Sequence, residues 1–255
     1  MFMKRFVKEG SIVREIWGNA DTILFIFAGA SAEFAVNKSV DWLYFTGKLP
    51  ADPLGRLFST VSYARQIVFS THDAALKAID QITAIHKEVE NKRGARIPDW
   101  AYRDVLFMLI DYSIRSYELL ERPLTTAEKS DIFDTFYQVG DRMGIAGLPK
   151  TYSEWTEMRS AHLQENLTKS TFSIDLYHQY KKHLGWGRYL LLKEVQVRIV
   201  PERVKEILSL GNLSAVTLIL PAYKFMRIFS IHHILRDLIL PKKYKLEIVS
   251  LDMAH

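Results

Sequence analysis

The chain has 255 residues, of which 48% are hydrophobic and 25% are charged, and its formal net charge is +5. These are ordinary globular values, so we expect no long disordered region and one large core in a single domain over residues 1–255. Cysteine is absent, which excludes disulfides, iron–sulfur ligation and a thiolate-ligated haem, and which fits a reducing cytoplasm.

Basic residues are scattered among the acids, and the densest cluster is Lys242-Lys243-Tyr244-Lys245. A solvated turn is the expected structure for this cluster, and a phosphate-binding or membrane-surface patch is the alternative. No nucleic-acid-binding motif accompanies it, so nucleic acid is not an expected partner. Nucleotide-binding glycine loops, the G-x-S-x-G of serine hydrolases and the H-E-x-x-H of metalloproteases are all missing.

The N-terminal ten residues contain basic side chains without the apolar region that a secretory signal needs. Two apolar runs, at residues 23–30 and 213–221, are far shorter than the roughly 20 residues that span a bilayer. We therefore expect a soluble, cytoplasmic protein with both runs buried in its core.

Almost every periodic stretch predicts a helix. The first is expected over about residues 11–44, with Ser11 as its N-cap and a break near Gly29. Two prolines and a glycine at residues 46–53 then forbid a helix. This loop leads directly into Arg56 and the candidate site residues that follow, so we expect it to lie beside the site.

Two helices are predicted between Arg56 and Glu90, because the short polar residues at 70–73 favour a helix start. The second helix carries a stripe of side chains at three- and four-residue spacing that includes His86. The other members of this stripe are Ala75, Ile79, Ile82 and Val89. The spacing therefore predicts that His86 points at the core.

A buried imidazole needs a partner, since burying a polar group without one costs on the order of 1–3 kcal/mol. One interpretation of His86 is a core histidine bonded to a carbonyl or carboxylate of a facing helix. The other is a metal or haem ligand, because neutral imidazole is the commonest metal-binding side chain. No second ligand lies at metal-site spacing on this helix, so spacing alone favours the first interpretation.

A long helix is predicted over Asp99–Glu121, after a polar connection at residues 91–98. Within it, Asp111 and Arg115 are four residues apart. Their spacing is typical of a partly buried intrahelical ion pair. The functional alternative makes Asp111 an acid or base of the site.

Further helices are expected along the rest of the chain. Thr125 or Thr126 is the expected N-cap of the next one, with Glu128 completing a capping box and Gly144 ending the helix. Ser153 is expected to cap the following helix. The remaining stretches predicted as helical are 171–185, 186–200 (where alternation also suggests a strand), 201–208 and 213–240.

The histidines of these later helices are not expected to form a metal site. His178 and His183 are five residues apart, which is a poor fit to one helical face, so both are predicted to be ordinary surface or partly buried residues. His232 and His233 are adjacent and point to different sides of a helix, so they cannot bind one metal together, although one of them could line the cavity.

One ordered set of short motifs runs through most of the chain. The set begins with Arg56-x-x-x-Thr60, Tyr63, Phe69 and His86-x-x-Val89. Downstream it continues with Tyr117-Glu118, Arg122-Pro123-Leu124-Thr125, Ala127-Glu128, Met143-Gly144-Ile145 and Leu148-Pro149. Further members are Arg14-Glu15, Ala28-Gly29-Ala30, and Leu220-Pro221 with Arg227. In its order and spacing over about residues 14–227, this set resembles the helical haem oxygenase family that includes latex clearing protein (rubber oxygenase) and the mycophenolic acid pathway oxygenase.

The resemblance implies that His86 binds the iron of a b-type haem and that Arg56 and Thr60 line the haem. Arg56 has suitable chemistry, because a guanidinium forks onto a carboxylate such as a haem propionate. Two positions depart from the family. Ser59 stands where the rubber-cleaving branch has a lysine that reaches the other face of the iron, which disfavours rubber as the substrate. Glu90 stands where a basic residue is expected.

A third departure is the family tryptophan at the start of the next helix, for which Trp100 is the nearest candidate.

The helical patterns and the resemblance together imply an all-α domain of about eight to ten helices that encloses an apolar haem pocket. The expected activity is oxygenation of a hydrophobic small molecule with dioxygen or peroxide, and His86, Arg56, Thr60 and Asp111 are the candidate site residues. Non-catalytic binding of haem or another apolar ligand, and a purely structural role, are the alternatives. The sequence carries no signal for the oligomeric state.

Overall fold

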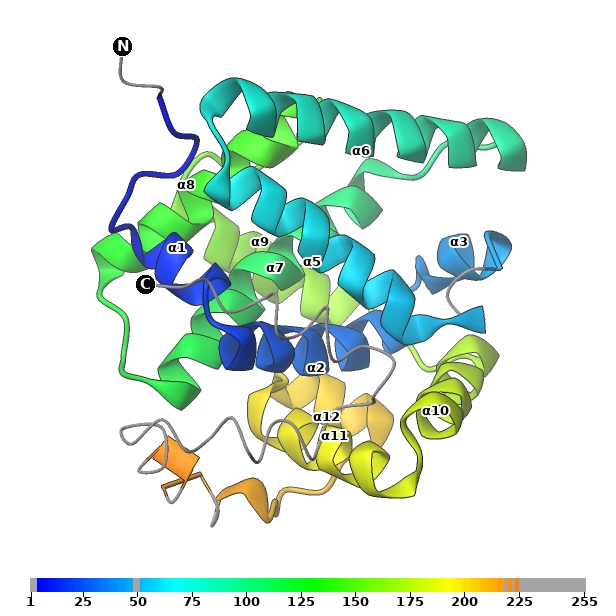
Figure 1. Ribbon diagram of the computed structural model, residues 1–255. Coiled ribbons are helices and arrows are strands. Elements are labelled where there is room, and N and C mark those ends of the chain that lie inside the picture. Colours follow the sequence, from blue (N-terminus) through cyan, green and yellow to red (C-terminus); the bar gives the residue numbers. More distant parts are fainter. Residues whose placement is uncertain (1–3, 48–50, 218–219, 222, 225–255) are drawn as a thin grey trace.

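The computed structural model describes residues 4–47, 51–217, 220–221 and 223–224 (Figure 1). Several predicted features lie outside these ranges: Arg227, His232-His233, the cluster Lys242–Lys245 and most of the last predicted helix.

The prediction of an all-α fold is confirmed. Eleven helices lie within the described residues, and these residues contain no β-strand, only two isolated β-bridges. The helices are α1 (Ile12–Trp17), α2 (Ala20–Val36), α3 (Val40–Phe45), α5 (Pro53–Phe69), α6 (His72–Arg93), α7 (Asp99–Leu120), α8 (Thr126–Arg142), α9 (Tyr152–Glu165), α10 (Thr171–Leu184), α11 (Trp186–Ile199) and α12 (Glu202–Leu208). Within the described part of the chain, no helix is long and apolar enough to cross a membrane.

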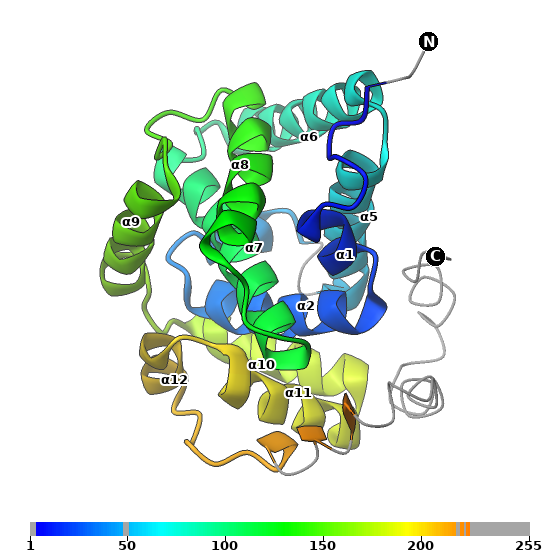
Figure 2. The same ribbon diagram turned by 90° about the vertical axis from the view of Figure 1, so that its left-hand side faces the viewer.

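Helix α2 is the central helix of the fold (Figures 1 and 2). It packs against α7 and also contacts α1, α10, α11 and α12. Its sequence explains this position, because α2 contains the apolar run at residues 23–30 and is buried on most of its sides. In Figure 1, α5 and α6 lie above α2, and α11 and α12 lie below it.

The predicted helix break near Gly29 is wrong. Gly29 lies inside α2, and the chain breaks earlier, at Gly18 and Asn19. The side chain of Asn19 caps α2 by accepting a hydrogen bond from the backbone N–H of Thr22 at 3.0 Å. At Gly29, a Cβ atom would lie 2.3 Å from two ring carbons of Tyr112 on α7. The glycine therefore permits close packing of α2 on α7 rather than a turn.

Most predicted helix ends are confirmed. Ser11 caps α1, and Thr125 and Glu128 form the capping box of α8. Helix α6 begins at His72, within the polar break at residues 70–73, and is capped at its end by Gly94, whose φ of 68° lies in the left-handed region that glycine adopts without strain. The cap at Ser153 is wrong, since Thr151 occupies this position and accepts a hydrogen bond from the N–H of Glu154 at 3.1 Å.

The ambiguous stretch at residues 186–200 is helical, as α11. Its packing explains the apolar alternation, because both α2 and α10 contact it and Val195, Val197 and Ile199 are buried. Of the two histidines on α10, His178 is exposed and His183 is partly buried, as predicted.

Candidate functional site

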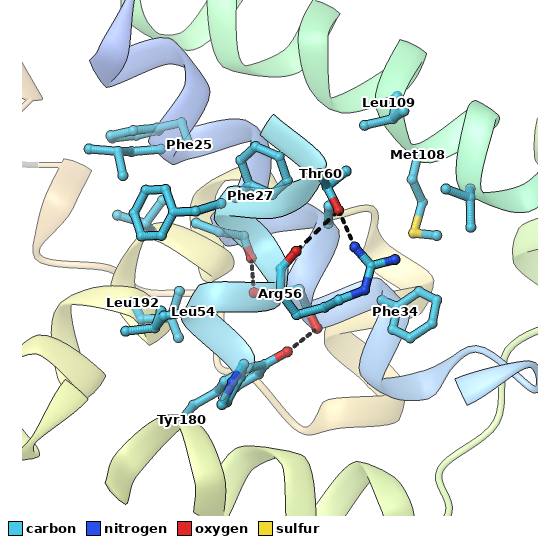
Figure 3. Close-up of a pocket in the computed structure, with 18 of the residues that line it drawn as sticks. Phe25, Phe27, Phe34, Leu54, Arg56, Thr60, Met108, Leu109, Tyr180 and Leu192 are labelled. Carbon is cyan, nitrogen blue, oxygen red and sulfur yellow. Dashed lines mark hydrogen bonds between the residues drawn. The ribbon is translucent and has the colours of Figure 1, made fainter. Parts of the chain in front are cut away.

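An apolar pocket of about 580 Å³ runs beside α2, between α5, α6 and α7 on one side and α10 and α11 on the other (Figure 3). This volume lies within the roughly 300–1,000 Å³ that is typical of small-molecule and cofactor sites. Its apolar walls include Leu24, Phe25, Phe27, Phe34, Leu109 and Leu192.

The pocket is long, because α2 contributes residues from Asp21 to Phe34. Thirteen helical steps at 1.5 Å each correspond to about 20 Å. Asp21 is 4% exposed and is a wall residue that the sequence analysis missed. An acidic residue in the first turn of a helix is common for electrostatic reasons alone, so the sequence held no signal that distinguished it.

Three predicted site residues, Arg56, Thr60 and His86, line this same pocket. Arg56 and Thr60 are one turn apart on α5. Nη1 of Arg56 donates a hydrogen bond to Oγ1 of Thr60 at 2.8 Å, and that hydroxyl donates to the backbone carbonyl of Arg56 at 3.3 Å. In Figure 3, the guanidinium extends from α5 towards Phe34 and Met108.

The start of α5 places Arg56 in the pocket. Asp52 caps the helix by accepting a hydrogen bond from the N–H of Gly55 at 3.0 Å, and Pro53 occupies the first turn, where its missing N–H costs nothing. Pro53 and Leu54 also line the pocket. The end of the loop at residues 46–53 therefore lies beside the site, as predicted, while residues 48–50 lie outside the described ranges.

The guanidinium of Arg56 carries a charge into an apolar environment. Among the described residues, no carboxylate pairs with it, and its partner is the neutral hydroxyl of Thr60. Burial lowers the pKa of Arg56, but the group stays protonated because its ordinary pKa is above 12. An anion bound at this point would supply the missing counter-charge.

The His86 imidazole has a defined tautomer. Its Nδ1 lies 2.9 Å from the backbone carbonyl oxygen of Ile82, one turn earlier on α6. A carbonyl oxygen only accepts, so Nδ1 carries the proton and Nε2 carries a lone pair. No residue of the described ranges hydrogen-bonds to Nε2. The expectation of a partner on a facing helix is therefore wrong, since the bonded carbonyl belongs to the same helix.

Burial disfavours the protonated form of His86. It is the largest influence and lowers the pKa of His86, and the charge of Arg56 acts in the same direction, while the carbonyl of Ile82 and the charge of Glu90 act against it. Along the helical stripe, Ala75 and Ile79 are buried but His86 is only partly buried. The first residues of the stripe thus lie in the core, whereas His86 lies in the pocket wall.

Two other residues singled out from the sequence do not line the pocket. Ser59 is exposed on α5. Asp111 forms the intrahelical ion pair with Arg115 that its spacing favoured, with 2.7 Å between Oδ1 and Nε. It also pairs with Arg159 of α9, with 2.8 Å between Oδ2 and Nη2.

Asp111 belongs to a buried ionic network that joins α2, α7 and α9. Glu33, which is 0% exposed, accepts a hydrogen bond from Nη2 of Arg159 at 2.6 Å and one from the hydroxyl of Tyr112 at 2.9 Å. Nε2 of His162 lies 3.0 Å from Glu33, and its Nδ1 lies 2.7 Å from Oδ1 of Asp104. The network therefore connects the central helix α2 to α7 and α9, and its residues do not line the pocket.

The network predicts a loss of stability at alkaline pH. Burial lowers the pKa of His162, but the carboxylates of Asp104 and Glu33 outweigh burial, so the net shift is upward from 6.5. A raised pKa stabilises the folded state fully below about pH 6.5, and this contribution disappears as the pH rises through the folded-state pKa. Urea unfolding between pH 6 and 9 is expected to show this decline, and His162→Gln is expected to remove it. An unchanged pH profile in that variant, with exposed His178→Gln as the control, would contradict the assignment.

Comparison with known proteins identifies one family. The family described as "ER-bound oxygenase mpaB/B'/Rubber oxygenase, catalytic domain" matches residues 18–231. No curated protein and no solved structure gives a significant match. The family match covers more than four fifths of the chain and includes every residue that lines the pocket. The chain belongs to the family of the mpaB/B' and rubber oxygenase catalytic domain.

Proposed function

We propose that this protein is a b-type haem-dependent oxygenase that acts on a hydrophobic small molecule, with His86 as the axial ligand of the iron and dioxygen or peroxide as the co-substrate. Family membership supports the oxygenase class. One observation carries the haem proposal: an imidazole with a lone pair on Nε2 and a guanidinium without a described carboxylate partner line the same apolar pocket.

His86 has the features of an axial ligand. Metal-binding histidines commonly donate their second ring N–H to a carbonyl or carboxylate, which fixes the tautomer and makes the ligating nitrogen more basic. The bond from Nδ1 to the carbonyl of Ile82 does both. The lowered pKa of His86 also favours the neutral, ligating form at pH 7.

Arg56 and Thr60 would bind the acidic edge of the cofactor. A guanidinium presents its N–H groups in a fixed fork that matches a carboxylate such as a propionate. The hydroxyl of Thr60 holds Nη1 of Arg56 at 2.8 Å, and thereby orients the remaining donors. Binding the carboxylate would also supply the counter-charge that the buried guanidinium lacks.

The apolar walls would hold the substrate and exclude water. Side chains such as Phe25, Phe27 and Leu192 offer no hydrogen bonds, so they select a ligand by the apolar surface it buries, at about 25 cal/mol per Å². When bound, a b-type haem supplies the iron at which dioxygen or peroxide reacts. The protein would supply the imidazole of His86 and the polarity of the pocket, and both would tune that iron.

Haem titration of the purified protein tests the proposal. The wild type is expected to develop a Soret band at one equivalent of haem, and His86→Ala is expected to lose or shift this band. His178→Ala is the matched control, because His178 is an exposed histidine on α10. A protein that stays colourless through the titration would overturn the proposal. A haem complex that is six-coordinate and inert to peroxide would instead favour the alternative, a binding protein without catalysis.

A further inference from the structure

We propose that Tyr102 and Glu90 are positioning residues that fix the orientation of the His86 imidazole. This inference rests on the proposed function of His86. It concerns a contact between the end of α6 and the start of α7 that neither the motifs nor the family match assigns to the site.

Tyr102 packs directly on the imidazole. The two rings meet edge to face, with their centroids 5.2 Å apart and their planes at 84°. This is a preferred geometry for aromatic pairs. The hydrogen bond from Nδ1 of His86 to Ile82 is directional, so it is lost when the imidazole turns about its outer side-chain bond. The Tyr102 ring blocks this turn.

Glu90 in turn holds Tyr102. Its Oε1 accepts a hydrogen bond from the hydroxyl of Tyr102 at 3.2 Å and another from the backbone N–H of Ile97 at 2.8 Å. Because Glu90 lies one turn after His86 on α6, it projects from the same region of the helix as the imidazole. A chain of contacts therefore runs from His86 through Tyr102 to Glu90 across the junction of α6 and α7.

The identity of residue 90 matters for this arrangement. Lysine and arginine side chains are donors only, so a basic residue here could not accept the hydrogen bonds from Tyr102 and Ile97. The arrangement therefore requires an acceptor such as Glu90. No cation of the described residues forms an ion pair with Glu90. Its carboxylate thus lies near His86, where it would stabilise positive charge on an imidazole bound to a metal.

Three substitutions separate the contributions of the ring, the hydroxyl and the charge. Tyr102→Ala removes the ring contact, and Tyr102→Phe keeps the ring while it removes the bond to Glu90. Glu90→Gln keeps an acceptor oxygen but removes the charge. Thermal unfolding of each variant checks that the fold is retained.

The first measurement uses the protein without haem. Nitrogen-15 NMR of the His86 ring is expected to show the Nδ1–H tautomer in the wild type, a mixture of tautomers in Tyr102→Ala, and a return towards the wild-type spectrum in Tyr102→Phe. A wild-type tautomer in Tyr102→Ala would overturn the positioning role. Because this readout needs no haem, it remains decisive even if the wild type fails to bind haem and the proposed function is wrong.

The second measurement uses the haem complex. Haem transfer to an acceptor protein is expected to be about 10–100-fold faster from Tyr102→Ala, the range that is usual when an outer-shell partner of a metal ligand is lost. Glu90→Gln is expected to change the transfer rate little but to make the reduction potential more positive, because the carboxylate no longer stabilises the oxidised iron. Equal rates and potentials in all variants would contradict the inference.

Discussion

Replacement of Arg159 with alanine is expected to lower the free energy of unfolding by about 3–5 kcal/mol, because it leaves buried charges without their partner. Glu33 and Asp111 both pair with this guanidinium, and Glu33 is 0% exposed. Burial raises the pKa of Glu33, but Arg159 and His162 outweigh burial and lower the pKa to about 2. Without Arg159, the carboxylates must either stay charged in the core or take up protons.

Urea unfolding of Arg159→Ala and of Arg142→Ala measures the effect against a matched control. Arg142 also forks onto a carboxylate, with 2.7 Å between Nη2 and Oδ2 of Asp80, but about half of each side chain is exposed. Such surface pairs contribute about 0–1 kcal/mol. A loss of stability in Arg159→Ala no larger than that in Arg142→Ala would contradict the structural importance of the buried network.

The second large effect on stability is expected at Gly29, where alanine should lower the free energy of unfolding by about 1–3 kcal/mol or more. The added Cβ would lie 2.3 Å from two ring carbons of Tyr112 and 3.1 Å from Cγ2 of Ile199. Tyr112 is fully buried and its hydroxyl is bonded to Glu33, so its ring cannot move aside without breaking the ionic network. Helices α2 and α7 must therefore separate.

Gly187→Ala is the control for this prediction. Gly187 also lies in a helix, α11, but a Cβ there meets no atom within 4 Å. Gly187 lies in the first turn of α11, where the preference for alanine over glycine is at most the roughly 1 kcal/mol of a helix interior, so this variant is expected to be neutral or slightly more stable. Equal melting temperatures for Gly29→Ala and the wild type would show that the contact with Tyr112 relaxes easily.

The helices and most of their ends were predictable because they depend on residues close in sequence. The capping box of Thr125 and Glu128 is complete within four residues, and the break before α6 follows from the short polar residues at 70–73. Ser153 shows the limit of this reasoning. Several residues near a helix start can act as caps. Thr151 is the cap here, because its backbone is extended, α9 begins at the next residue, Tyr152, and its side chain accepts a hydrogen bond from the N–H of Glu154.

The candidate site was predictable only in part. Arg56 and Thr60 lie one turn apart on one helix, so their contact is local, and His86 shares their pocket although it comes from the next helix. The family resemblance, rather than spacing, linked these three residues. Asp111 was also a candidate site residue from the sequence, but in the structure it belongs to the ionic network and does not line the pocket.

The sequence by itself determined the all-α class, the absence of thiolate chemistry and most of the helix caps. It also singled out Arg56, Thr60 and His86, which line one pocket in the structure. Tertiary structure alone decided what Gly29 meets and that Asp111 pairs with a second arginine. Both depend on a partner far away in the sequence, which is Tyr112 for Gly29 and Arg159 for Asp111. Periodicity reports which face of a helix a residue occupies, but only the packing of helices shows what that face meets.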